Sequence, residues 1–234
     1  DVGITPPRGI VEKVVRKGIE PKSHVDVVFT GPFAFDTRNQ VVLDALTIVL
    51  ETRLRETLRE ALGGTYGVEV GTRASKIPKG EYSITIDFGC DPSRAEELVK
   101  TVFREIEAFR TAGPSEREVR DAREALLRRH ESDLALNANL AGEIAERYEN
   151  GVDVSEFFGL PAQYMGLTTT AIRDGAQQYL DTKNYVRVTL YPEKSESQSP
   201  SRSESQSRSE SRSWSRSGPG PHPDPAPVAP LCEL

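Results

Sequence analysis

Residues 59–67 read Arg-Glu-Ala-Leu-Gly-Gly-Thr-Tyr-Gly and mark the passage from a long helix to a strand. Upstream, leucines recur every three or four residues, which is the spacing of one buried helix face. This pattern predicts a helix over Thr37–Leu62. Gly63 is the expected terminator of that helix, because glycine adopts a positive φ without steric cost. Arg59 and Tyr66 are therefore expected to lie at one helix–strand corner, seven residues apart.

Outward from this corner, alternation of apolar and polar residues predicts the strands of a sheet. The expected strands are residues 10–17, 24–30, 65–73, 81–88 and 185–191. A short turn containing Pro21 separates the first two strands. We therefore expect these two strands to pair with each other as a hairpin.

Helical periodicity and capping residues predict four further helical regions. Asp91 is expected to cap one of them, with Pro92 as its first residue, and Ser115 with Glu118 forms a capping box that opens the next. The expected regions are residues 92–111, 115–149 with a break near 137–139 or at Gly142, 155–165 and 169–181.

The order of these elements is β-β-α-β-β-α-α-α-α-β. Strand clusters separated by helix clusters favour an α+β fold over the alternating order of a doubly wound sheet. The sequence thus predicts a two-layer sandwich, in which helices pack on one face of a mostly antiparallel sheet. We expect residues 1–193 to form this domain.

The last part of the chain, residues 194–234, has a different composition. Serine occupies every second position from Ser195 to Ser217, mostly between charged or amide residues, and prolines follow. Such a segment buries too little apolar surface to offset its ordering entropy, so a disordered Ser/Arg- and Pro-rich tail is expected. A linker and a gene-prediction artefact are both open explanations of its origin.

Composition excludes several functional classes. The net charge of −6 argues against a nucleic-acid-binding domain. No apolar run approaches the ~18 residues that a membrane span requires. The two cysteines, Cys90 and Cys232, are too few for a zinc site, and we expect no disulfide between them.

No metal or nucleophile motif is present in the sequence. The three histidines, His24, His130 and His222, lie far apart, and neither His-x-x-x-His nor His-x-x-Glu-His occurs. His130 is expected to be a solvated histidine on a helix face, and Cys90 a small buried residue. We therefore predict no catalytic residue and no metal ligand in this chain.

Arg59 and Tyr66 have an ordinary structural explanation and a functional one. A cation in the last helical turn favours the helix dipole and can pair with Glu56, and a tyrosine suits a strand. Alternatively, the guanidinium and the phenol share one side of the turn and donate hydrogen bonds to a carbonyl oxygen. Their spacing permits both explanations.

Several segments, in order, resemble the C-terminal half of a bacterial pitrilysin/insulinase-family zinc peptidase. They are residues 6–23 (Pro-Pro-Arg-Gly-Ile-Val-Glu-Lys), 29–33 (Phe-Thr-Gly-Pro-Phe), 54–67, 82–92 (Tyr-Ser-Ile-Thr-Ile-Asp-Phe-Gly-Cys-Asp-Pro) and 190–193. The resemblance covers about residues 6–193. It implies the α+β unit of mitochondrial-processing-peptidase-like metallohydrolases, two halves of which close around a peptide.

The resemblance also implies a division of labour. Zinc and the catalytic glutamate are expected on an N-terminal half, which is this chain's expected partner, and this chain binds no cofactor itself. Arg59 and Tyr66 match the family's substrate-binding Arg and Tyr in type, spacing and placement. By this resemblance, the chain is expected to be inactive alone, to bind the peptide substrate and to complete the active site that the N-terminal half supplies. A periplasmic or exported location is favoured by the resemblance.

Two alternatives remain open from the sequence. The chain is a non-catalytic peptide-binding or assembly subunit of the same family, or it is a truncated gene product whose tail comes from a shifted reading frame. An adjacent His-x-x-Glu-His sequence would favour the enzyme, and the nucleotide sequence around codon 194 tests the last alternative.

Overall fold

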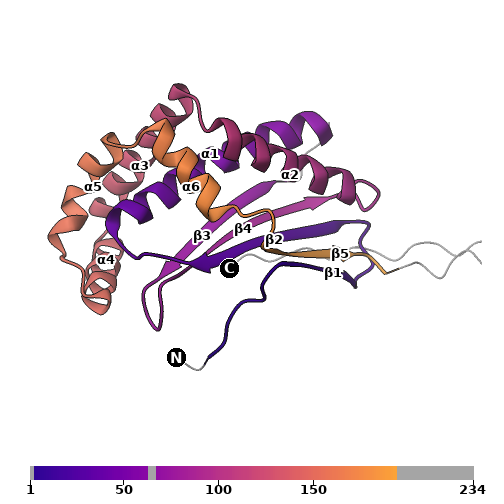
Figure 1. Cartoon of the computed structure of the whole chain (residues 1–234), viewed down its shortest axis with the longest axis horizontal. Coiled ribbons are helices and arrows are strands. Elements are labelled where there is room, and N and C mark those ends of the chain that lie inside the picture. The colour runs from indigo at the N-terminus through magenta and orange to yellow at the C-terminus, as the bar shows by residue number, and fades with distance from the viewer. Residues whose placement is uncertain (1–2, 63–66, 194–234) are drawn as a thin grey trace, which may run out of the picture. The chain divides into compact units, whose positions relative to one another are not determined.

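The computed structural model describes residues 3–62 and 67–193, with the side chains of residues 60–62 outside that description. One α+β unit results, as predicted (Figure 1). Its strands are β1 (Ile10–Arg16), β2 (Ser23–Pro32), β3 (Val68–Ser75), β4 (Glu81–Cys90) and β5 (Tyr185–Tyr191). Its helices are α1 (Thr37–Leu62), α2 (Ala95–Ala112), α3 (Glu116–Ala135), α4 (Asn137–Asn150), α5 (Ser155–Met165) and α6 (Thr169–Tyr179).

The five strands form one mixed sheet in the order β1-β5-β2-β4-β3. Three pairings are antiparallel, and the pairing of β1 with β5 is parallel. The sheet is therefore mostly antiparallel, as predicted.

The predicted hairpin of the first two strands is wrong, because β5 lies between β1 and β2. β1 is exposed along nearly its whole length and carries charged residues on both faces, which suits an edge strand. β5 alternates strictly and has buried positions at Arg187 and Thr189, so it takes the inner place. Short separation in sequence favoured the hairpin, but burial decided the pairing.

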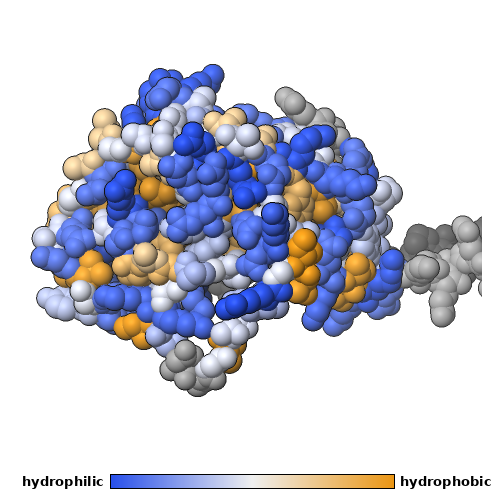
Figure 2. Space-filling view, in the orientation of Figure 1, coloured by the Kyte–Doolittle hydropathy of each residue, from blue (hydrophilic) through white to orange (hydrophobic). Residues whose placement is uncertain are grey.

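The helices lie on one face of the sheet, and the other face carries no helix among the described residues (Figure 1). Between the layers, inward residues of β2 and β4 pack against the leucine stripe of α1. The buried leucines of that stripe are Leu43, Leu46, Leu50, Leu54 and Leu58. Positions on the other face, which we call the open face, are partly exposed. Hydrophilic residues dominate the surface seen in Figure 2, with hydrophobic residues in small patches.

The predicted helix ends agree with the structure at some positions and not at others. Ser115 and Glu118 form the capping box of α3, and the predicted break falls at Leu136, between α3 and α4. The start predicted at Pro92 is wrong: α2 begins at Ala95. Asp91 accepts hydrogen bonds from the backbone and hydroxyl of Ser93, which holds residues 92–94 in a turn.

Two predictions on the chain's organisation have different outcomes. Residues 194–234 lie outside the described residues, so the domain boundary and the disordered tail stay predictions. None of the described helices combines the length and the apolar character that crossing a membrane demands.

Candidate functional site

The helix–strand corner, residues 59–67, is placed by buried residues on either side of it. Leu58 is 2% exposed and anchors the last turn of α1 in the core, while Val68 is 7% exposed and begins β3. Arg59 follows Leu58 directly and is exposed in that last turn. The predicted placement of Arg59 at the end of a helix is thus confirmed.

Arg59 forms no ion pair with any other described residue. In particular, its guanidinium does not pair with Glu56 one turn back, the partner that the structural explanation offered. Tyr66, together with Gly63, lies outside the described residues. The geometry of the Arg59–Tyr66 pair therefore stays a prediction, and so does the left-handed helix end.

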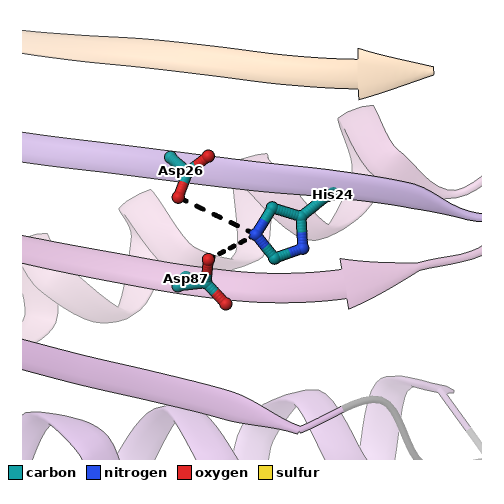
Figure 3. A group of neighbouring side chains, drawn as sticks. All are labelled: His24, Asp26 and Asp87. Atoms are coloured by element: carbon teal, nitrogen blue, oxygen red, sulfur yellow. Dashed lines mark hydrogen bonds and ion pairs between the residues drawn. The ribbon is translucent and has the colours of Figure 1, made fainter. Parts of the chain in front are cut away.

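A second group of polar side chains lies on the open face, where the sequence predicted no site. His24 and Asp26 project from β2, and Asp87 projects from β4 (Figure 3). Each offers a potential ligand atom, and these atoms lie within 4.8 Å of one another. His24 Nε2 is hydrogen-bonded to Asp87 Oδ2 and lies 3.8 Å from Asp26 Oδ1.

Sheet register explains why these residues meet. Asp26 is paired with Asp87 across the β2–β4 ladder, and His24 is paired with Gly89. His24 and Asp26 are two residues apart on one strand, so they share a face, and the imidazole leans from β2 toward Asp87 of β4 (Figure 3). The period-two spacing was visible in the sequence, but Asp87 could be added only once the β2–β4 pairing was known.

The electrostatics of this cluster are dominated by its carboxylates. Partial burial and the adjacent Asp87 raise the pKa of Asp26, although His24 opposes that shift. Glu69 of β3 is paired with Asp87 and is exposed on the same face. Three carboxylates, Asp26, Asp87 and Glu69, therefore form a row across three neighbouring strands.

The prediction of a solvated His130 is wrong. His130 is 5% exposed, and its ring packs 4.8 Å from the ring of Phe157 and 6.2 Å from that of Tyr164. It borders a hollow of about 380 Å³ between α1, α3, α4, α5 and β3. Burial lowers the pKa of His130. Sequence reasoning missed this because α5, which covers the histidine, lies more than twenty residues further along the chain.

Cys90 is fully buried, as predicted. Burial raises the pKa of its thiol to about 11, which leaves it protonated at neutral pH and unsuited to nucleophilic attack.

The residues of this chain do not fit the catalytic zinc of the resembled peptidases. The inverted motif His-x-x-Glu-His is missing from the sequence. Within residues 3–62 and 67–193, His24, Asp26 and Asp87 are the one group of three potential metal ligands, and no glutamate base accompanies them in a helical motif. No catalytic step can be assigned to zinc on this chain.

Comparison with known proteins identifies relatives of a large part of this chain. A model of the family described as "Peptidase M16 inactive domain" matches residues 2–126. A curated relative, "Zinc protease PQQL-like" of Arabidopsis thaliana, is 28% identical over 109 residues, which are 44% of this chain and 11% of the relative. This chain thus spans about a tenth of the length of that relative.

Solved structures of low sequence identity share the fold. The periplasmic protease PqqL from Escherichia coli superimposes with a TM-score of 0.71 at 21% identity, covering 81% of this chain and 21% of that chain. A peptidase M16 inactive domain from Pseudomonas fluorescens gives a TM-score of 0.69 at 19% identity, covering 81% and 45%. These likenesses support the α+β unit that the sequence predicted.

Proposed function

Because this chain belongs to the peptidase M16 inactive domain family, we propose that it is the C-terminal, non-zinc-binding domain of a zinc metalloendopeptidase. In this role it binds the peptide substrate and completes an active site whose zinc and catalytic base belong to an N-terminal half. That half is either part of the same polypeptide or a separate subunit. The isolated domain has no peptidase activity.

The position of Arg59 carries this proposal. The side chain is exposed, follows a buried leucine and has no ion-pair partner among the described residues, so its guanidinium is available to a ligand. A guanidinium donates up to five hydrogen bonds and can hold a peptide carbonyl oxygen from one side. Tyr66, seven residues further on, would add a phenolic donor to the same oxygen.

Three further observations support the division of labour. The chain carries no inverted zinc motif, and it matches a family described as inactive. It also covers 21% of the length of the E. coli PqqL chain, as a single module of a larger protein would. PqqL of E. coli is a periplasmic protease, and this likeness supports a periplasmic or exported location for this protein.

The experiment uses the complete enzyme, with this chain and its N-terminal half. Arg59→Met and Tyr66→Phe should each lower kcat/KM for a peptide substrate by about 10- to 100-fold, because each removes one donor to the carbonyl oxygen. Zinc content should remain that of the unmodified enzyme. Arg55→Met is the matched control, since Arg55 lies one turn earlier on α1 and pairs with Glu51.

Unchanged turnover in both Arg59→Met and Tyr66→Phe would refute the assigned role. A complete protein that binds peptide but never cleaves it would instead favour the non-catalytic peptide-binding or assembly subunit.

A further inference from the structure

We propose that His24, Asp26 and Asp87 form a binding site for one divalent transition-metal ion, such as Zn²⁺ or Co²⁺, on the open face of the sheet. This site is independent of the zinc that the proposed function places on the N-terminal half. The sequence alone predicted no metal ligand on this chain, because two of the three residues meet the third only through the β2–β4 pairing.

The first argument is electrostatic. Like charges directly opposite each other on neighbouring strands destabilise a sheet, yet Asp26 faces Asp87, and Glu69 extends the row on β3. Lys13 is the cation of β1 in the same row, but Val188 of β5 separates it from Asp26. Among the described residues, Asp26 and Asp87 form ion pairs with His24 and not with Lys13. A bound cation would neutralise the row locally.

The second argument is the donor set. One imidazole nitrogen with two carboxylates suits borderline metal ions such as Zn²⁺ and Co²⁺, whereas Mg²⁺ and Ca²⁺ favour oxygen ligands alone. In this arrangement His24 supplies Nε2, and each aspartate supplies one oxygen. Water would complete the coordination, because the three side chains are 46%, 39% and 37% exposed.

The third argument is that little movement is required. Ligand atoms of a tetrahedral zinc site lie about 3.3 Å apart, since each is about 2.0–2.2 Å from the metal. The three candidate atoms already lie within 4.8 Å of one another. Their strands are held by the core through Val25, Val27 and Phe88, which are at most 1% exposed. Side-chain rotation alone can therefore close the site around an ion.

The alternative to a bound metal ion is a proton on His24, because the imidazolium also supplies positive charge between the aspartates. The imidazolium adds one charge and leaves the row of three carboxylates net negative. A divalent ion replaces the His24–Asp87 hydrogen bond with coordination and adds one more positive charge. Metal titration of the isolated full chain separates the two cases.

The test titrates the 234-residue chain with Co²⁺ at neutral pH and follows the visible absorption of the bound ion. We expect one Co²⁺ per chain, displaced by Zn²⁺ but not by Mg²⁺. His24→Gln and Asp87→Asn should each weaken binding at least about tenfold. The matched controls are His222→Gln, which removes the tail histidine, and Glu81→Gln, which removes a carboxylate at the other end of β4.

Circular dichroism checks that each variant is folded. Absence of Co²⁺ binding by the unmodified chain would overturn the proposal, as would full-strength binding by His24→Gln or loss of binding in His222→Gln. The result does not depend on peptidase activity. Arg59→Met should bind Co²⁺ like the unmodified chain, so this proposal and the proposed function can fail separately.

Discussion

Asp26 and Asp87 lie directly opposite each other in the β2–β4 ladder, on the face of the sheet that no described helix covers. Partial burial and the neighbouring carboxylate raise the pKa of Asp26. This pairing opposes folding of the metal-free protein, because like charges directly opposite each other on neighbouring strands destabilise a sheet.

Asp26→Asn should stabilise the metal-free protein at neutral pH by about 0.2–1 kcal/mol, since it removes one charge of the pair. The pKa of Asp26 is higher in the folded protein than in the unfolded chain, where it is 3.8. Its carboxylate therefore destabilises the folded protein at pH values above the folded pKa, and it has no such effect below pH 3.8. The gain should therefore shrink as the pH falls toward 3.8. Urea unfolding with chelator present measures it. Asp121→Asn, on the exposed face of α3, should show no such gain, and an equal gain there would contradict the explanation.

Glu118→Gln should destabilise the protein by about 1–3 kcal/mol. Arg53 Nε and Nη2 donate to the two Glu118 oxygens at 2.5 and 2.9 Å, joining α1 to α3. Burial raises the pKa of Glu118, but hydrogen bonds from Arg53 and Ser115 outweigh it and lower the pKa to about 2.

Because the folded pKa of Glu118 is below its unfolded value of 4.5, its contribution is complete above pH 4.5 and is lost as the pH falls toward 2. Chemical denaturation across this range should show a shallower pH dependence in Glu118→Gln than in the unmodified protein. Glu124→Gln is the control, since its pair with Arg128 is exposed and 3.5 Å long. Parallel pH profiles for all three proteins would contradict the role of Glu118.

His130→Gln should weaken the dependence of the free energy of unfolding on pH near pH 6. Burial lowers the pKa of His130 below 6.5, so the unfolded chain binds a proton that the folded chain resists. The unmodified protein should therefore lose stability as the pH falls below about 6.5. His24→Gln, at an exposed histidine, is the comparison. The explanation fails if His130→Gln keeps the slope of the unmodified protein.

Tyr82→Phe should lower the free energy of unfolding by about 1–2 kcal/mol. The Tyr82 hydroxyl donates to the backbone oxygen of Tyr179 at 3.1 Å within the core, and its removal takes away the hydrogen bond that this oxygen accepts from a described side chain. Tyr148→Phe is the control, because Tyr148 is 75% exposed. Thermal unfolding measures both changes, and equal losses in the two variants would contradict this account.

Much of the fold could be predicted from the sequence because it depends on local periodicity. The leucine stripe of α1 and the strict alternation of β4 fix which of their residues are buried, and the capping box at Ser115 fixes a helix start. The pairing of β1 could not be predicted in this way. Burial of the inner strand β5, which follows more than 150 residues later, competes with the local hairpin.

The same distinction between local and long-range determinants applies to the candidate sites. The sequence by itself determined that Arg59 lies in the last turn of a helix with one buried face and that no inverted zinc motif is present, because both depend on neighbours within one turn or one motif. Only the tertiary structure brought Asp87 to His24 and Asp26, and only it enclosed His130 beneath α5. These contacts join segments 27 to 63 residues apart, where pairing and packing, rather than local preference, decide which side chains meet.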